Sequence, residues 1–125
     1  MRKCIYICFL LLFLAACTEP PSKEETDQFN KDVETVLNIL DTAYSANREL
    51  NYEEERELVT FGAYYGSDSD FYKGLKDSEA KLAAQGLLLM ESTLSKDYIS
   101  VGGETQEEEY NDYKKDVESY LNNLK

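Results

Sequence analysis

Apolar residues recur at intervals of three and four along the chain after Ser22, which is the period of an amphipathic helix. Ser22 and Glu25 have the spacing of a capping box, in which each side chain accepts a hydrogen bond from the other's backbone N–H. We therefore predict a first helix over residues 24–47. Its inward face comprises Phe29, Val33, Val36, Leu37, Leu40, Ala43 and Tyr44.

A second, shorter helix is predicted over residues 52–65. Asn51 is a favourable N-cap, and the glutamates at 53–55 place negative charge in the first turn, where the helix dipole stabilises it. Gly66 is expected to cap the other end. The inward face comprises Leu58, Phe61 and Tyr65.

Turn-forming residues at 66–70 precede a third predicted helix over residues 70–95. Gly74 and Gly86 lie inside it, and each costs about 1 kcal/mol relative to Ala in a helix interior. We therefore expect a bend or break between Gly74 and Ser78. The predicted inward face comprises Phe71, Leu75, Leu82 and Leu89, with the neighbours Leu87, Leu88, Met90 and Leu94.

Residues 98–104 form a predicted loop, and Thr105 with Glu108 repeats the capping-box spacing. A fourth helix then runs to the end of the chain, with Tyr110, Tyr113, Val117, Tyr120, Leu121 and Leu124 on its apolar side. No run of alternating strand residues interrupts this pattern. The sequence therefore predicts an all-α fold, a small antiparallel bundle of about four helices with short connections.

The first sixteen residues follow a different pattern. Arg2 and Lys3 precede the apolar run 5–14, which ends in the small residues Ala15 and Ala16, the layout of a secretory signal peptide. A transmembrane anchor is the alternative, but residues 5–16 are twelve in number and a spanning helix needs roughly 20. We predict a cleaved signal over residues 1–16.

Leu14-Ala15-Ala16-Cys17 resembles the lipobox of bacterial lipoproteins at all four positions. The resemblance implies cleavage between Ala16 and Cys17 and a diacylglyceryl group on the Cys17 sulfur, which gives stable anchoring because two acyl chains are buried. Residues 17–22 would then be the lipid anchor and proline-rich tether, and residues 23–125 the helical domain. The expected location is the extracytoplasmic face of the cell membrane.

Charge narrows the choice of partner. The formal net charge of −12 falls to −14 when Arg2 and Lys3 leave with the signal. A surface this acidic is unsuited to nucleic acid and is repelled by anionic lipid headgroups. The tether at 18–22, extended at roughly 3 Å per residue, reaches about 15 Å. We therefore expect a membrane-associated protein partner.

The residue types present limit the possible chemistry. The chain has no His, Cys4 and Cys8 lie within the signal, and Cys17 is expected to carry lipid. Mechanisms that use a thiolate or an imidazole are therefore excluded, and the 25 acidic residues make chance carboxylate pairs uninformative. We expect no enzymatic activity and no cofactor.

One stretch has part of the spacing of a calcium loop. Asp68 and Asp70 fall on its first and third positions, but Lys73 stands at the sixth, where the sharp turn needs Gly. A turn that caps the third helix is the preferred interpretation, and no metal site is predicted.

Tyrosine is the abundant aromatic residue, and five tyrosines fall on apolar stripes, where we expect core or half-buried rings with hydrated hydroxyls: Tyr44, Tyr65, Tyr110, Tyr113 and Tyr120. Tyrosine also supplies rigid contact area at interfaces. The candidate partner interface is Tyr64, Tyr65, Tyr72 and Tyr98. Packing of these rings under loops is the open alternative.

The predicted function is a non-enzymatic protein-binding module held at the membrane. Short acidic lipoproteins of this plan resemble the exclusion lipoproteins of Gram-positive conjugative elements and prophages, through the lipobox at 14–17, the short body and the helical pattern. That resemblance implies a factor that blocks redundant conjugative transfer or DNA entry by binding a transfer component. The alternative is an envelope lipoprotein that holds a small ligand or metal between its helices.

Overall fold

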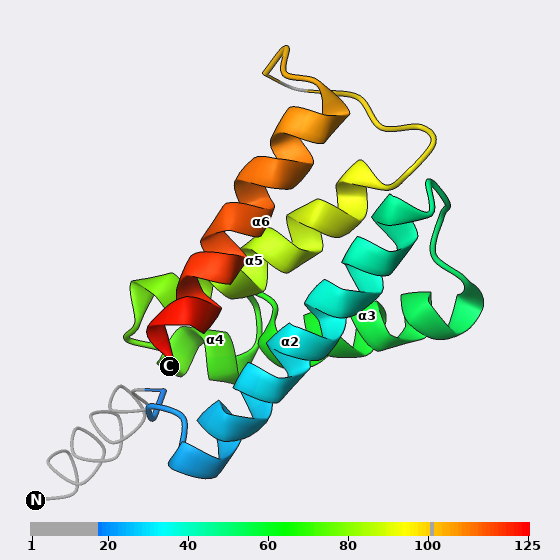
Figure 1. The fold of residues 1–125 in the computed structure, drawn as a ribbon. Coiled ribbons are helices and arrows are strands. Elements are labelled where there is room, and N and C mark those ends of the chain that lie inside the picture. The colour runs from blue at the N-terminus through cyan, green and yellow to red at the C-terminus, as the bar shows by residue number, and fades with distance from the viewer. Residues whose placement is uncertain (1–17, 101) are drawn as a thin grey trace, which may run out of the picture.

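The computed structural model describes residues 18–100 and 102–125, and these residues form a small helical bundle without strands (Figure 1). The all-α prediction is confirmed. The helices are α2 (Lys23–Ser45), α3 (Tyr52–Tyr65), α4 (Asp70–Gly74), α5 (Ser78–Thr93) and α6 (Gln106–Asn123).

Local capping chemistry sets the helix starts. Ser22, Asn51 and Thr105 each accept a hydrogen bond from the backbone N–H three residues on, and the glutamate there bonds back to the cap. Helix α2 ends at Ser45, two residues before the predicted end, and the left-handed φ of 50° at Asn47 turns the chain away. Gly66 caps α3 as predicted.

The predicted third helix is divided into α4 and α5 by an extended segment at 75–77. Asp77 caps the new helix by accepting hydrogen bonds from the N–H groups of Glu79 and Ala80. The prediction that Leu82 and Leu89 face inward is wrong, since they are 50% and 44% exposed. Because of the break, the rotation of α5 about its axis is not set by the residues of α4. The buried face of α5 includes Ala80, Ala83, Ala84, Leu87 and Met90.

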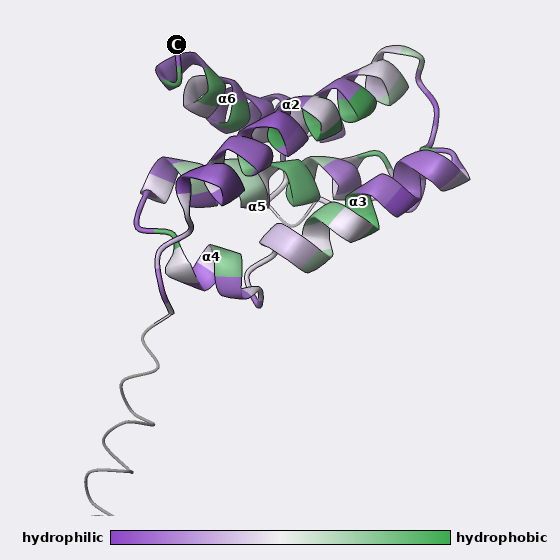
Figure 2. Ribbon diagram, turned by 90° about the horizontal axis from the view of Figure 1, so that it is seen from below, coloured by the Kyte–Doolittle hydropathy of each residue, from purple (hydrophilic) through white to green (hydrophobic). Residues whose placement is uncertain are grey.

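The helices lie in layers. In Figure 1, α2 and α6 are in front, α5 lies behind them, and α3 and α4 are at the back, as the view from below in Figure 2 also shows. Helices α5 and α6 run antiparallel and approach closely at Gly86, where an added Cβ would lie 3.2 Å from the Tyr113 carbonyl oxygen. A side chain at this position would press against α6, and glycine avoids that contact.

Three buried tyrosines attach helix α2 to its neighbours. Their hydroxyls each donate a hydrogen bond of 2.5 Å to a polar side chain of α2: Tyr65 to Asp32, Tyr110 to Asp41, and Tyr120 to Asn30. The rings are buried as predicted, with 8%, 1% and 3% exposure. Their hydroxyls, expected to be hydrated, are satisfied within the protein instead.

Candidate functional site

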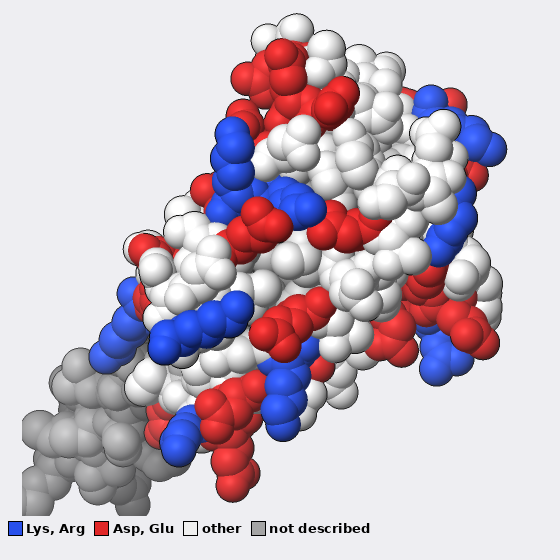
Figure 3. Space-filling model, viewed as in Figure 1, with Lys and Arg blue, Asp and Glu red and all other residues white. Residues whose placement is uncertain are grey.

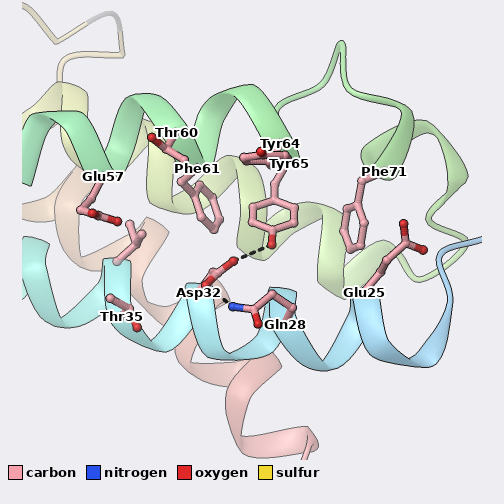
Figure 4. Close-up of a pocket in the computed structure, with 11 residues that line it drawn as sticks. Glu25, Gln28, Asp32, Thr35, Glu57, Thr60, Phe61, Tyr64, Tyr65 and Phe71 are labelled. Atoms are coloured by element: carbon pink, nitrogen blue, oxygen red, sulfur yellow. Dashed lines mark hydrogen bonds between the residues drawn. The ribbon is translucent and has the colours of Figure 1, made fainter.

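A groove of about 420 Å³ lies between α2 and α3, which run antiparallel along its two sides (Figure 4). Helix α3 contributes Glu57, Thr60, Phe61, Tyr64 and Tyr65, and α2 contributes Glu25, Gln28, Asp32, Thr35 and Val36. Phe71 of α4 closes the end near the start of α2. The groove therefore draws on three helices, and its shape depends on how they pack.

Aromatic rings form the apolar part of the groove. The Tyr65 ring lies 4.9 Å from both Phe61 and Phe71, measured between ring centroids, and the contact with Phe71 is edge-to-face. Beneath them Phe29, which is fully buried, packs against Tyr65 at 4.9 Å and Phe71 at 5.0 Å. This rigid cluster presents an apolar surface to whatever enters the groove.

Carboxylates line the other part of the groove. Asp32 accepts hydrogen bonds from the Tyr65 hydroxyl at 2.5 Å and from Gln28 Nε2 at 2.8 Å, as Figure 4 shows. Burial and the bond to Asp32 raise the pKa of Tyr65 well above its usual range, so this hydroxyl remains a donor at neutral pH. Glu57 is exposed on α3, and Glu25 stands at the opposite end.

The groove differs in charge from the front of the molecule. In Figure 3, Lys and Arg alternate with Asp and Glu over α2 and α6, and acidic residues gather where α6 begins. Among the described residues that line the groove there are three carboxylates and neither Lys nor Arg. The groove is therefore both apolar and negatively charged.

The proline-rich segment 18–22 lies against α4 and does not simply extend into solvent. A Cβ added to Gly74 would meet the Glu19 carbonyl oxygen at 2.3 Å and Pro21 Cδ at 3.4 Å, so only glycine permits this contact. A hollow of about 560 Å³ between the segment and α4 is lined in part by Glu25 and Phe71, which also line the groove. The two depressions therefore lie next to each other and share these residues.

The four candidate interface tyrosines do not share one surface. Tyr64, 67% exposed, and the buried Tyr65 both line the groove. Tyr72 is half-buried on α4, with Lys81 Nζ 5.2 Å from its ring centroid. Tyr98 lies with Tyr44 in a separate depression of about 500 Å³ near the end of α2, and its hydroxyl donates to Glu109.

The polar side of the groove was not predicted from the sequence. Gln28, Asp32 and Thr35 lie on α2 at helical spacing beside the buried stripe of Phe29, Val33 and Val36. The sequence does show a polar stripe that borders an apolar stripe on α2. The polar stripe forms part of a groove only because α3 lies opposite it, and the pattern within α2 does not specify which helix packs beside α2.

Some sequence predictions fall on residues that the structure does not describe. Ala16 and Cys17, the predicted cleavage and lipidation residues, lie outside the described residues. Within the described ranges, no helix is long and apolar enough to cross a bilayer, and no three potential ligands gather at metal-binding distance. The turn at 68–70 does cap a helix, since Ser69 accepts a hydrogen bond from the Tyr72 N–H at the start of α4.

No protein family, curated protein or solved structure matches this chain.

Proposed function

We propose that this protein is a lipid-anchored, extracytoplasmic module that binds another protein through the groove between α2 and α3. The observation that carries the proposal is the open groove, whose aromatic floor is buried while Tyr64 stands exposed at its edge. Interfaces favour rigid aromatic side chains within reach of solvent, beside polar groups that can be desolvated on binding.

The chemistry of the groove supports binding rather than catalysis. Asp32 already accepts hydrogen bonds from Tyr65 and Gln28, and these bonds fix the side chain in the groove wall. Burial and the bond to Asp32 raise the pKa of the Tyr65 phenol, so it keeps its proton and is a weak nucleophile, and Gln28 is an amide. The lipobox-like residues at 14–17 support anchoring through Cys17.

Site-specific photocrosslinking in cells tests the binding proposal. A photoreactive amino acid in place of Tyr64 should capture a membrane-associated protein, whereas the same group in place of Tyr52 should not. Tyr52 is the matched control, because it lies on the same helix, is 76% exposed and does not line the groove. Equal capture of the same proteins from both positions would contradict the proposal.

Anchoring has its own test. Labelled palmitate should be incorporated into the wild-type protein and not into Cys17→Ser, which should leave the membrane fraction. A Cys17→Ser protein that remains in that fraction and carries label would contradict lipidation at this residue.

We further propose that binding excludes a second conjugative element or phage. The support is the resemblance of residues 14–17, the short body and the helical pattern to exclusion lipoproteins. Recipient cells that display the wild-type protein should accept fewer transfers from a related element than cells that display Tyr64→Asp. Unchanged transfer from every related element tested would overturn this part of the proposal.

A further inference from the structure

We infer that the partner segment is a basic amphipathic helix from the part of a membrane protein that adjoins the bilayer. The inference rests on the proposed function, and it specifies the chemistry of the groove's occupant. Three features carry it: the charge of the groove, its apolar floor, and the position of the groove beside the segment that leads to Cys17.

The negative charge of the groove indicates that its occupant is positively charged. Glu25, Asp32 and Glu57 line one groove, and its described lining includes neither Lys nor Arg. The lining therefore supplies no positive charge to these carboxylates, and a bound lysine or arginine would complement their charge. The exposed ring of Tyr64 adds a face on which a cation can lie.

The apolar floor indicates that the occupant also has an apolar side. Phe61, Tyr65 and Phe71 lie side by side along the groove (Figure 4), and Phe71 is only partly buried, so apolar side chains of an occupant can contact this row at its open edge. An amphipathic helix presents apolar side chains at intervals of three and four residues to such a groove. Its basic residues can then meet the carboxylates along the edges.

The location of the groove indicates a partner segment next to the bilayer. Residues 18–22 pack against α4 through Gly74, and with Glu25 and Phe71, which also line the groove, they line the neighbouring hollow. With lipid on Cys17, this end of the groove is tied to the membrane by a docked segment. A partner segment close to the membrane surface is therefore within reach of this end of the groove.

Fluorescence titration with designed peptides tests the inference. The full lipidated protein is placed in phosphatidylcholine vesicles, and the probe is a peptide of about 18 residues with lysines on one side and a single Trp on the apolar side. The protein contains no Trp, so the Trp emission reports on the peptide alone. Vesicles without protein supply the baseline.

The expected result is saturable binding with a blue-shifted emission, weakened when salt is raised from about 0.05 to about 0.5 M. A peptide with Glu in place of Lys, and a Lys peptide with its apolar residues dispersed, should both bind at least tenfold more weakly. Linking the Lys peptide to a membrane-spanning helix in the same vesicles should lower the protein concentration needed for half-saturation.

Two single variants locate the binding. Glu57→Gln should weaken the Lys peptide about threefold, because it removes one groove charge that is exposed on α3. Glu34→Gln is the matched control and should leave affinity unchanged. It is exposed on α2 about 200° round the helix from Asp32.

Equal binding of the Lys and Glu peptides, or equal affinity of the two variants, would overturn the inference. So would Lys-peptide binding that tolerates dispersal of its apolar residues, because a cation alone would then suffice. If the Tyr64 crosslink captures a partner while the Lys peptide fails to bind, the proposed function stands and the basic amphipathic occupant is wrong.

Discussion

The hydroxyl of Tyr110 donates a hydrogen bond of 2.5 Å to Asp41 Oδ1, joining α6 to α2 at a partly buried position. Asp41 Oδ2 accepts a second contact from Lys114 Nζ at 2.8 Å. The Tyr110 ring also stacks on Tyr44, with centroids 3.9 Å apart and planes 5° from parallel. One buried tyrosine therefore links two helices through its hydroxyl and its ring.

Tyr110→Phe should reduce the free energy of unfolding by about 2 kcal/mol, because hydrogen bonds to charged groups contribute roughly 1.5–3 kcal/mol. The ring and its stack on Tyr44 are retained, so the loss reports on the hydroxyl alone. Urea unfolding followed by circular dichroism measures it. Tyr52→Phe, at a position 76% exposed, should change nothing, and an equal effect of both substitutions would refute this account.

Glu54 gives the protein a stability that is lost in acid. Bidentate hydrogen bonds from Arg48 and a bond from the Asn51 N–H lower the pKa of Glu54 from 4.5 to about 2. The unfolded chain therefore binds a proton first as pH falls, and the contribution of Glu54 is complete above pH 4.5 and lost towards pH 2.

Glu54→Gln should consequently be less stable than wild type at neutral pH, and the two should converge as the pH approaches 2. Urea unfolding at a series of pH values measures the difference between the proteins, so titrations common to both cancel. A gap that stays constant from neutral to acid pH would contradict the assigned pKa shift.

The pH dependence that Glu91 gives to stability runs in the opposite direction to that of Glu54. Burial on α5, and secondarily the charge of Glu55 on α3, raise the pKa of Glu91 above 4.5. The folded state then holds its proton more tightly than the unfolded chain, so stability falls as pH rises from 4.5 through the raised pKa. Glu91→Gln should be more stable than wild type at neutral pH, and this advantage should shrink in acid. The exposed Glu34→Gln should not show that trend.

Gly62 and Gly86 should respond differently to substitution. A Cβ at Gly62 would meet Leu88 Cδ2 at 3.5 Å, an ordinary contact, so Gly62→Ala should stabilise α3 by up to about 1 kcal/mol. At Gly86 the Cβ would lie 3.2 Å from the Tyr113 carbonyl oxygen and from Val117 Cγ2. Gly86→Val should destabilise by about 1–3 kcal/mol through overpacking, and thermal melts compare the two. Similar shifts for both would contradict the close approach of α5 and α6.

Helix positions could be predicted because their signals are local. The caps at Ser22, Asn51 and Thr105 satisfy N–H groups within three residues, so the sequence around each contains the necessary information. The same holds for the buried stripe of α2. These features do not depend on which other helices lie nearby.

The remaining features of the fold and of the groove depend on contacts between residues that are distant in the sequence. Leu82 and Leu89 were misassigned because the extended segment at 75–77 resets the rotation of α5, and periodicity cannot be carried across it. The contact of Gly74 with the Glu19 carbonyl joins segments that no local pattern connects. The groove likewise exists only because α3 lies opposite Asp32, so its polar side could not be recognised within α2 alone.

The hydrogen bonds from Tyr65, Tyr110 and Tyr120 to α2 together fix the position and rotation of that helix. Their acceptors, Asp32, Asp41 and Asn30, are spread over several turns, and the donors come from two different helices. A slip of α2 by one residue would turn it by about 100° and separate all three pairs at once. Apolar contacts tolerate such a slip far better, so these bonds select one packing arrangement among many of similar hydrophobicity.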